Sequence, residues 1–260
     1  MDAEKQRIRI LLSYEGTDFS GWQRQALGQR TIQDSLEKAL SQLFNEPITV
    51  IGSGRTDARV HAHGQVAHFD TSRDIAKYDF LYALRGLLPR SIGVRKAWLA
   101  PRAFHARNSA VRKTYRYRIL NAAHPSPFLR NYALWIRRSL DVERLNSLVQ
   151  PLVGTHDFKS FQTGDQYYET TVRTIEAAQW QKKGPVLTFS VTGNGFLTHM
   201  VRNIVGTTLN LDYKGESPKE MTDILAAKDR KLARATAEPQ GLLLYQVEYP
   251  HTLDIQCRKI

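Results

Sequence analysis

The segment GSGRTDARVHAHGQVAHF, residues 52–69, concentrates residue types that can do chemistry. Asp57 stands between Arg55 and Arg59, and a nearby cation keeps a carboxylate ionised and orients it. The same two arginines can also bind a phosphate through paired hydrogen bonds. Asp57 is therefore a candidate nucleophile, acting as a single carboxylate rather than as one of the pair used in ordinary glycoside hydrolysis.

Two other interpretations of this segment stay open. Asp57 can be the polar tip of a turn, with its carboxylate satisfied by nearby backbone amides. His61 and His63 form an HxH pair whose side chains point the same way on a strand, and with His68 they could bind a metal ion. The remaining histidines are scattered, and no second carboxylate cluster completes a coordination shell, so we expect no metal here.

The charge of the chain indicates a polyanionic partner. Lys and Arg number 37 against 25 Asp and Glu, which gives a net charge of +12. Arginines occur in almost every segment rather than in one tail, which favours a broad binding surface. Neutralising phosphates releases counterions, so basic surfaces of this kind commonly bind nucleic acid. Solubility alone is the alternative explanation.

Composition excludes several other classes of protein. Apolar residues make up 42% of the 260, which is typical of a folded globular chain rather than a disordered one. The N-terminal residues place charges on both sides of a short apolar run, and no apolar run of about 18 residues follows, so we expect neither a signal peptide nor a membrane span. Cys257 is the single cysteine, which excludes an intrachain disulfide and favours the cytoplasm.

Hydrophobic patterning predicts the elements that position these residues. In the first hundred residues it predicts strand, helix, two strands, helix and strand at 7–14, 31–44, 48–53, 64–70, 78–88 and 92–100. We expect Thr31 to cap the first helix, with Asp34 in its first turn, and Pro89 to end the second. The segment around Asp57 then joins two strands, so a rigid scaffold presents it.

The second part of the chain repeats this order. The predicted elements are a strand at 111–120, a helix at 141–153, strands at 171–180 and 185–193, helices at 195–211 and after Ser217-Pro218, and a strand at 241–249. Two β-α-β-β-α-β units predict an α+β fold of paired ferredoxin-like halves, with a mainly antiparallel sheet, helices packed on it and a central cleft. We expect the halves to be residues 1–105, with the Asp57 loop, and 106–260.

Six segments, in order, resemble the signature segments of the tRNA pseudouridine synthase A (TruA) family. GSGRTDARVHAHGQVAHFD (52–70) is similar to the active-site loop of that family, GRTDAGVHAxGQVxHF. The others are YEGTDFSGWQRQ (14–25), FHARNSAVRKTYRYRI (104–119), GTHDFKSFQ (154–162), GFLTHMVRNIVG (195–206) and PQGLLLYQVEY (239–249). The resemblance covers nearly the whole chain and implies the pseudouridine synthase fold.

One position departs from the family pattern. Residue 59 is Arg where the family usually has Gly. A positive φ at this position would cost an arginine about 1 kcal/mol. We expect ordinary extended backbone here instead, with Arg59 adding a phosphate contact.

The resemblance implies an isomerisation without a metal or organic cofactor. Pseudouridine formation breaks the N-glycosidic bond of a uridine, turns the uracil and joins it back to the ribose through C5. By resemblance Asp57 is the nucleophile, Tyr115 stacks on the uracil and acts as the base at C5, and Arg202 pairs with the aspartate across the two halves. Further residues of the matching segments are expected to bind substrate: Arg55, Arg59, Arg24, His61, Arg107, Lys113 and Leu242.

The residues themselves leave plainer roles open for three of these positions. Tyr115 shares a strand face with Lys113 and Tyr117, where core packing is the usual role of a tyrosine. Arg202 lies on a helix with a wide apolar stripe and needs an anionic partner, which a structural ion pair could also supply. Leu242 matches a family leucine that packs on the base, but a core strand position explains it equally well.

The implied substrate is tRNA, modified at uridines 38–40 of the anticodon stem-loop by a homodimer that holds one tRNA across both subunits. The target base must leave its stack, and recognition would be mainly of shape and phosphates. The alternatives are an RNA-binding module with an inactive site, a metal hydrolase using His61 and His63, and a related synthase that modifies other uridines.

Overall fold

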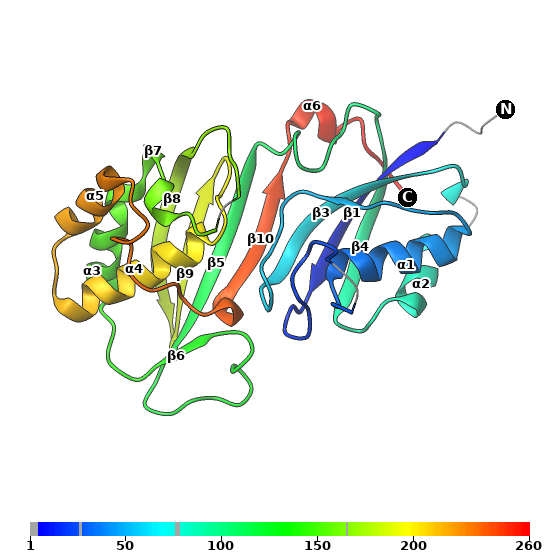
Figure 1. The fold of residues 1–260 in the computed structure, drawn as a ribbon. Coiled ribbons are helices and arrows are strands. Elements are labelled where there is room, and N and C mark those ends of the chain that lie inside the picture. Colours follow the sequence, from blue (N-terminus) through cyan, green and yellow to red (C-terminus); the bar gives the residue numbers. More distant parts are fainter. Residues whose placement is uncertain (1–4, 26–27, 76–78, 165) are drawn as a thin grey trace. The chain divides into compact units, whose positions relative to one another are not determined.

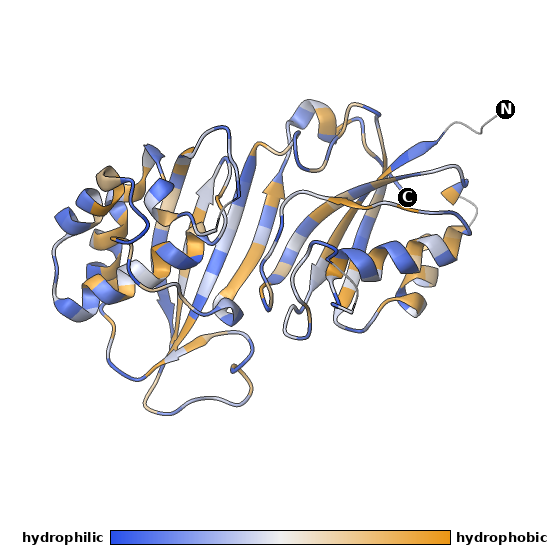
Figure 2. Ribbon diagram, viewed as in Figure 1, coloured by the Kyte–Doolittle hydropathy of each residue, from blue (hydrophilic) through white to orange (hydrophobic). Residues whose placement is uncertain are grey.

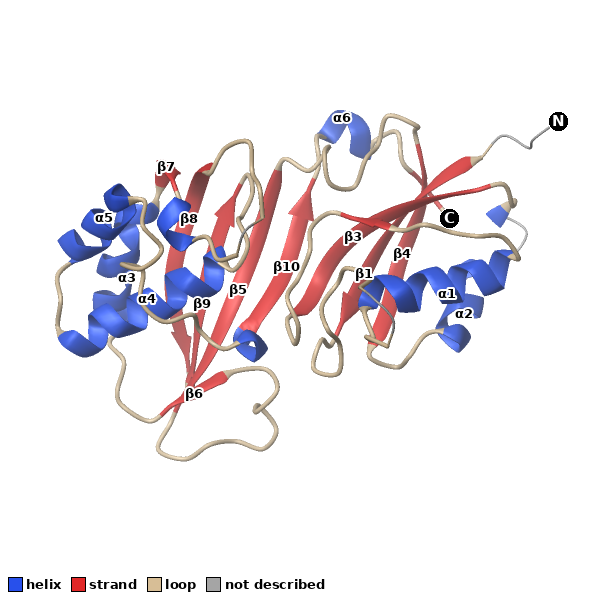
Figure 3. Cartoon of the chain, in the orientation of Figure 1, coloured by secondary structure: helices blue, strands red, loops and turns tan. Residues whose placement is uncertain are grey.

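The computed structural model describes residues 5–25, 28–75, 79–164 and 166–260, and they form a mixed α+β chain (Figures 1 and 3). Most of its strand pairs are antiparallel, and helices accompany them, as predicted. The chain divides into two compact units, residues 1–111 with 244–260 (unit 1) and residues 112–243 (unit 2). The domain division at residues 105 and 106 stays a prediction.

Unit 1 is built on a sheet with the strand order β11-β4-β1-β3-β10, in which the first four strands are antiparallel neighbours. Its strands are β1 (Gln6–Tyr14), β3 (His61–Thr71), β4 (Ile92–Ala100), β10 (Leu242–Glu248) and β11 (Arg258–Lys259), and β2 (Ile51–Gly52) pairs with β3. The first two residues of β10 belong to unit 2. Ile8, Ile10 and Leu12 of β1 are fully buried, because alternate residues of this central strand face the core.

Two helices pack on this sheet, α1 (Ile32–Phe44) and α2 (Phe80–Leu87). The Thr31 hydroxyl accepts a hydrogen bond from the Asp34 amide at 3.3 Å, so the predicted cap of α1 is confirmed. Figure 2 shows hydrophilic and hydrophobic residues alternating along α1, and its apolar face ends at Phe44, whose ring stacks on Phe80 at 5.8 Å. The helix predicted at 78–88 starts with Tyr78, which lies outside the described residues.

The strand predicted at 48–53 is largely wrong, because only Ile51–Gly52 pairs with another strand. Side chains of α1 bind the preceding backbone instead. The Val50 amide donates to the Glu37 carboxylate at 3.0 Å, and the Val50 carbonyl accepts from the Gln33 side chain at 3.1 Å. Backbone groups already satisfied in this way do not need a neighbouring strand.

The segment 244–260 completes unit 1 with β10, α6 (His251–Asp254) and β11. Arg9 of β1 is buried and donates to the carboxylate of Asp254. Its guanidinium also lies over the rings of Trp98, Phe104 and Tyr249, 4.6–5.1 Å from their centroids. Residues far apart in the sequence therefore contact the buried guanidinium of Arg9.

Unit 2 contains the antiparallel strand order β5-β9-β8-β7. Its strands are β5 (Arg112–Asn121), β7 (Gly154–Asp157), β8 (Val172–Lys183) and β9 (Val186–Gly193), and β6 (Leu134–Ile136) pairs in parallel with β5. The short strands β6 and β7 were not predicted, because three or four residues are too few to show a periodicity.

Three helices pack in unit 2: α3 (Val142–Val149), α4 (Met200–Lys214) and α5 (Pro218–Ala227) (Figure 3). α3 is capped by Asp141, and the predicted helix at 141–153 ends early in a 3₁₀ turn, Gln150–Leu152, that contains Pro151.

The helix predicted at 195–211 begins only at Met200, preceded by His199 with a φ of 60°. The backbone of Thr198 is already committed elsewhere: its carbonyl accepts from the Thr163 amide, and its amide donates to the Tyr168 hydroxyl, both at 3.1 Å. These bonds keep residues 195–199 outside the helix.

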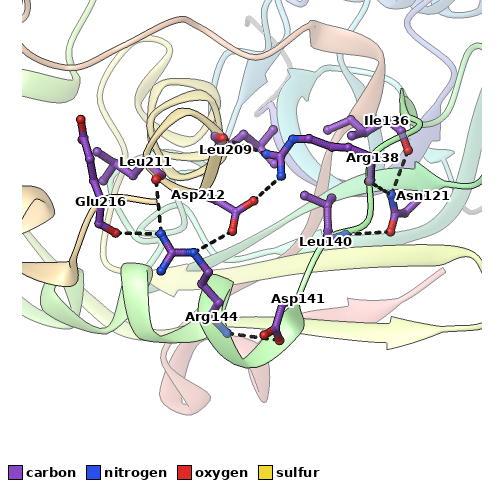
Figure 4. A network of polar contacts seen from close by, with 10 residues as sticks. All are labelled: Asn121, Ile136, Arg138, Leu140, Asp141, Arg144, Leu209, Leu211, Asp212 and Glu216. Carbon is purple, nitrogen blue, oxygen red and sulfur yellow. Dashed lines mark hydrogen bonds and ion pairs between the residues drawn. The ribbon is translucent and has the colours of Figure 1, made fainter. Parts of the chain in front are cut away.

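A polar network fixes the last turn of α4 (Figure 4). The carboxylate of Asp212, which is 6% exposed, accepts hydrogen bonds from Arg138 and Arg144. The same arginines donate to backbone carbonyls at this helix end, those of Leu209, Leu211 and Glu216. Cations here satisfy carbonyls that the helix leaves open and complement its dipole.

Asn121 at the end of β5 belongs to the same region (Figure 4). Its amide nitrogen donates to the carbonyls of Ile136 and Arg138, and its oxygen accepts from the Leu140 amide at 3.2 Å. One side chain therefore fixes the segment that leads from β6 to α3.

Candidate active-site residues

Asp57 lies in the loop between β2 and β3 and is half-buried. Backbone hydrogen bonds determine the path of this loop. The Asp57 carbonyl accepts from the Val60 amide at 3.2 Å, which closes a turn. On either side, the Thr56 carbonyl accepts from the Trp22 amide at 3.0 Å, and the Arg59 amide donates to the Phe19 carbonyl at 3.2 Å. Residues 19–22 therefore hold the nucleophile candidate in place.

Two glycines of the segment YEGTDFSGWQRQ permit this close approach. Gly21 has a φ of 94°, and a Cβ on it would lie 2.6 Å from the Thr56 carbonyl oxygen. A Cβ on Gly16 would lie 2.1 Å from the Val60 oxygen. Any larger residue would push the two backbones apart, so both glycines are required by the loop.

Buried polar side chains of β1 and β3 form hydrogen bonds with residues of the loop. The Tyr14 hydroxyl and the Thr56 hydroxyl are 2.8 Å apart, and the Gln65 amide donates to the Gly54 carbonyl at 2.9 Å. Burial raises the pKa of the Tyr14 phenol well above its usual value, so this group stays neutral. Sequence reasoning missed Tyr14 and Gln65 as supporting residues, although both lie in the signature segments and are polar at strand positions that face the core.

The three histidines of the loop and β3 have separate partners. His61 is buried and accepts from the Gly16 amide through Nδ1 at 3.0 Å, and His68 is buried and accepts from the Ala106 amide through Nδ1 at 3.1 Å. His63 is exposed and stacks on Tyr245, with ring centroids 5.2 Å apart. Among the described residues no group of three or more His, Cys, Asp and Glu could hold a metal ion.

The expected backbone at Arg59 is wrong. Its φ is 65°, in the left-handed region rather than the extended one. The turn closed by Asp57 and Val60 and the bond to Phe19 impose this conformation on whatever residue occupies position 59. An arginine here costs about 1 kcal/mol relative to glycine. Its side chain is exposed.

The other arginines of unit 1 that we expected to bind substrate, unlike the buried His61, are also exposed. Arg55 donates to the Gln23 side chain at 3.1 Å, and Arg24 pairs with Glu37 at 2.9 Å while its own side chain remains 61% exposed. Arg107 is exposed on the turn that follows Phe104. A ligand can therefore reach all three arginines from solvent.

In unit 2, Tyr115 lies on the buried face of β5, two residues before Tyr117, as the alternation predicted. Its ring meets Phe196 edge to face, with centroids 5.1 Å apart. The Tyr117 hydroxyl donates to the Glu238 carbonyl at 2.7 Å, which gives Tyr117 a structural role. Lys113 is half-buried at the start of the same strand, opposite Gly193.

Arg202 lies in the first turn of α4 and is half-buried. Its Nε donates to the Ala237 carbonyl at 2.8 Å, and the Ala237 amide donates back to the Arg202 carbonyl at 3.0 Å. Gly206 makes this approach possible, because a Cβ there would lie 1.8 Å from the Ala235 oxygen. The guanidinium is therefore oriented by backbone rather than by a flexible side chain.

Leu242 is buried at the start of β10, directly after the 3₁₀ turn Pro239–Gly241. Gly241 packs on the ring of Tyr117, where a Cβ would lie 2.6 Å from a ring carbon. Residues 237–241 thus contact both the Tyr117 strand and the Arg202 helix. The structure brings together the parts of unit 2 that carry Tyr115, Arg202 and Leu242, and unit 1 carries Asp57.

The sequence of this α+β chain places it among the pseudouridine synthases. A sequence model described as tRNA pseudouridine synthase matches residues 10–108 and 148–250. The chain is 48% identical over 259 residues to "tRNA pseudouridine synthase A" of Bdellovibrio bacteriovorus, covering 98% of this chain and 99% of that protein. The proteins of the same name from Geobacillus kaustophilus and Bacillus subtilis are each 44% identical, over 94% of this chain and 95% and 99% of theirs.

The chain belongs to the tRNA pseudouridine synthase A family and is therefore an isomerase. Across the residues that the structure describes, no helix combines the length and apolar character needed to cross a membrane.

Proposed function

We propose that this enzyme converts uridine to pseudouridine in tRNA, with Asp57 as the nucleophile. The observation that carries the proposal is the Asp57 loop: one carboxylate, half-buried, on backbone fixed by residues 19–22 and by Tyr14. A reaction that breaks one bond to C1′ and forms another needs a catalytic group held at a fixed position relative to the ribose and the base.

The reaction leaves the atom count unchanged. The bond between N1 and C1′ breaks, a bond between C5 and C1′ forms, and the proton lost from C5 is balanced by one gained at N1. An ionised carboxylate can serve this sequence by adding to C1′, by adding to C6 of the uracil or by assisting formation of a glycal. Each of these routes needs Asp57 unprotonated at the start.

Tyr115, Arg202 and Leu242 complete the proposed site. Tyr115 presents a ring on the buried face of β5, where it can stack on the uracil and take the C5 proton. By resemblance to the family, Arg202 supplies the positive charge that pairs with the carboxylate of Asp57. Leu242 supplies an apolar contact for the base, consistent with its burial beside the 3₁₀ turn.

The proposed substrate region is the anticodon stem-loop, at uridines 38–40, and the proposed assembly is a homodimer in the cytoplasm. The net charge of +12 supports a polyanionic substrate. The proposed phosphate-binding and base-binding residues are Arg24, Arg55, Arg59, His61, Arg107 and Lys113. The ferredoxin-like character of the two halves, residues 1–105 and 106–260, belongs to the same proposal.

Replacing Asp57 by Asn tests the role of the nucleophile. Asparagine keeps the size of the side chain but is a far poorer nucleophile, so tritium release from tRNA labelled at uridine C5 should fall to background. Affinity for tRNA should stay equal or rise slightly, because one negative charge is lost.

The matched control is Asp18→Asn, which removes the same charge from an exposed position next to Phe19, whose carbonyl accepts from the Arg59 amide of the loop. It should keep both turnover and binding. Turnover near the wild-type rate in Asp57→Asn would exclude Asp57 as the nucleophile, and joint loss of binding and folding would make it a structural residue.

A further inference from the structure

The backbone of residues 104–106 is held by buried polar groups from the strands and the C-terminal segment of unit 1. Arg7 of β1 donates to the Phe104 carbonyl at 2.8 Å. His68 of β3 accepts from the Ala106 amide through Nδ1 at 3.1 Å. The Tyr249 hydroxyl donates to the Ala106 carbonyl at 2.7 Å. The chain therefore leaves Ala106 from a fixed point.

The His105 side chain closes the turn formed by residues 105–108. Its Nδ1 accepts from two amides, that of Arg107 at 3.2 Å and that of Asn108 at 3.1 Å. Its own backbone amide donates to the Ser109 hydroxyl at 3.0 Å, and its carbonyl accepts from the Ser109 amide at 2.9 Å. An acceptor at position i that binds the amides of i+2 and i+3 is the arrangement that Asp and Asn side chains make at turns and helix caps.

The turn places two residues at the surface of the protein. Arg107 and Asn108 are exposed, whereas Ala106 before them is fully buried. Exposed arginine and asparagine side chains next to a rigid backbone are suited to phosphate and sugar contacts, which set the register of a nucleic acid on a protein.

We propose that His105 is a positioning residue for RNA binding, because its imidazole fixes the turn that presents Arg107 and Asn108 to the tRNA backbone. This inference rests on the proposed function, since the ligand is the same tRNA. His105 touches neither the uracil nor the ribose in this role. It acts by fixing the direction in which the Arg107 side chain projects from the backbone.

The charge state of the imidazole decides whether the turn is closed. Nδ1 accepts a hydrogen bond only when it carries no proton, so the ring must be neutral with its proton on Nε2. Burial lowers the pKa of His105, and the charges of Arg7 and Arg107 lower it further. The ring of His68 lies 4.9 Å away, and burial lowers the pKa of His68 to about 4.

The remaining charged groups around the histidine pair reinforce the neutral state. Asp70 of β3 is the carboxylate whose charge raises the pKa of His68, and it is bound by Arg7 through two hydrogen bonds of 2.8 and 2.9 Å and by Arg102 at 3.5 Å. Its negative charge is thus largely compensated. Both rings accept backbone amides, and burial, followed by the charge of Arg7, lowers the pKa of both.

The pH dependence follows from the direction of these shifts. A histidine whose pKa is lower in the folded protein than in the unfolded chain makes the unfolded chain bind more protons. Its contribution to stability is complete above the ordinary pKa of about 6.5 and is lost as pH falls toward the lowered value. The turn at His105 should open in the same window.

This dependence opposes the general electrostatic trend. Protonating histidines adds positive charge, and added positive charge by itself strengthens binding to a polyanion. An affinity for tRNA that weakens on the acid side therefore indicates loss of a structure that binding needs, and not a change in net charge.

The test compares three forms of the full-length enzyme: wild type, His105→Ala and His105→Asn. Asparagine can close the turn as an acceptor but does not titrate. At neutral pH we expect His105→Ala to raise the dissociation constant and KM for tRNA about tenfold, with kcat nearly unchanged, because two hydrogen bonds that orient Arg107 are lost. His105→Asn should restore wild-type affinity.

The pH profile supplies a readout that packing alone does not change. Between about pH 7 and pH 5, at constant ionic strength, affinity of the wild type for tRNA should fall relative to His105→Asn. Equal profiles for the two forms would overturn the proposal, and so would wild-type affinity in His105→Ala. If the alanine variant fails to fold by circular dichroism, the comparison of wild type with His105→Asn still decides.

A double variant separates this proposal from the proposed function. In an Arg107→Ala background, His105→Ala should add little to the loss of affinity, because the group that it positions is already absent. Fully additive losses would overturn the link between His105 and Arg107. Failure of the wild type to form pseudouridine would instead reject the proposed function, and the binding measurements would be unaffected.

Discussion

Arg59 has a backbone conformation that suits glycine, with a φ of 65°. Replacing it with glycine should raise the free energy of unfolding by about 1 kcal/mol, because the left-handed conformation is no longer strained. Affinity for tRNA should weaken slightly through loss of one charge, while turnover is preserved. Chemical denaturation and tRNA titration measure the two effects.

Arg59→Ala is the matched control, since it removes the charge but keeps the Cβ that causes the strain. It should match the glycine variant in affinity and the wild type in stability. Equal stabilisation by alanine and glycine would show that the arginine side chain, rather than the positive φ, causes the loss of stability. An inactive Arg59→Gly enzyme would show that Arg59 takes part in the reaction.

Arg202 and Asp57 should be energetically coupled. Losses in kcat/KM from Arg202→Ala and Asp57→Ala should be strongly non-additive in a double-mutant cycle, as expected for residues that serve one step. Arg202→Lys should not restore full activity, because lysine lacks the planar guanidinium, which donates to the Ala237 carbonyl through Nε and whose fork of nitrogens suits an anion. Additive losses would place Arg202 in a purely structural role.

The catalytic roles assigned from the sequence stay predictions, and the residues that support the Asp57 loop were not predicted. Asp57, Tyr115 and Arg202 follow from motif resemblance. Tyr14 was missed because its contacts with Thr56 and Gln65 join residues 42 or more positions apart. Gln65 was missed because it binds Gly54, in a loop whose path depends on such distant contacts. The conformation of Arg59 was predicted wrongly because backbone bonds to Phe19 impose it, and no local preference of arginine indicates it.

The last turn of α4 depends on a single buried carboxylate. Asp212→Asn keeps the shape of the side chain but leaves Arg138 and Arg144 without a counter-charge, so we expect the free energy of unfolding to fall by about 2 kcal/mol. The arginines are about a third exposed, which moderates the loss. Urea denaturation with an unchanged m-value checks this.

Asp223→Asn is the control for this element. Asp223 pairs with Lys219 on the surface of α5 and is 55% exposed, so its loss should cost less than about 0.5 kcal/mol. Equal effects at the two positions would show that the Asp212 network adds nothing to stability.

The existence of most longer elements could be predicted, but not all of their ends. Periodicity reports which residues are buried, and it located β4 at 92–100 and α1 at 32–44 correctly. It does not report which partner takes each backbone hydrogen bond. Val50 is bonded to Glu37 rather than to a strand, and Thr198 is bonded to Thr163 rather than within α4, so both elements were predicted too long.

The affinity of the whole molecule for tRNA should depend steeply on salt. If the net charge of +12 serves binding, the logarithm of the association constant should fall linearly with the logarithm of salt concentration, by about 0.7 to 0.9 for each phosphate contact. Titrations at several salt concentrations measure the slope. Arg59→Ala should reduce it by about one contact, and a flat response in the wild type would show that the charge only aids solubility.

The discontinuous composition of unit 1 has a consequence for the growing polypeptide on the ribosome. Residues 1–111 emerge first, yet β3 gains its neighbour β10, and Arg9 gains Asp254 and Tyr249, only when residues 244–260 have been synthesised. Until then the edge of β3 lacks its strand partner and a buried arginine lacks its counter-ion, and both conditions favour association with other chains. Unit 2 is contiguous, so the half of the enzyme that is translated first is the last to be completed, and it is the half that carries Asp57.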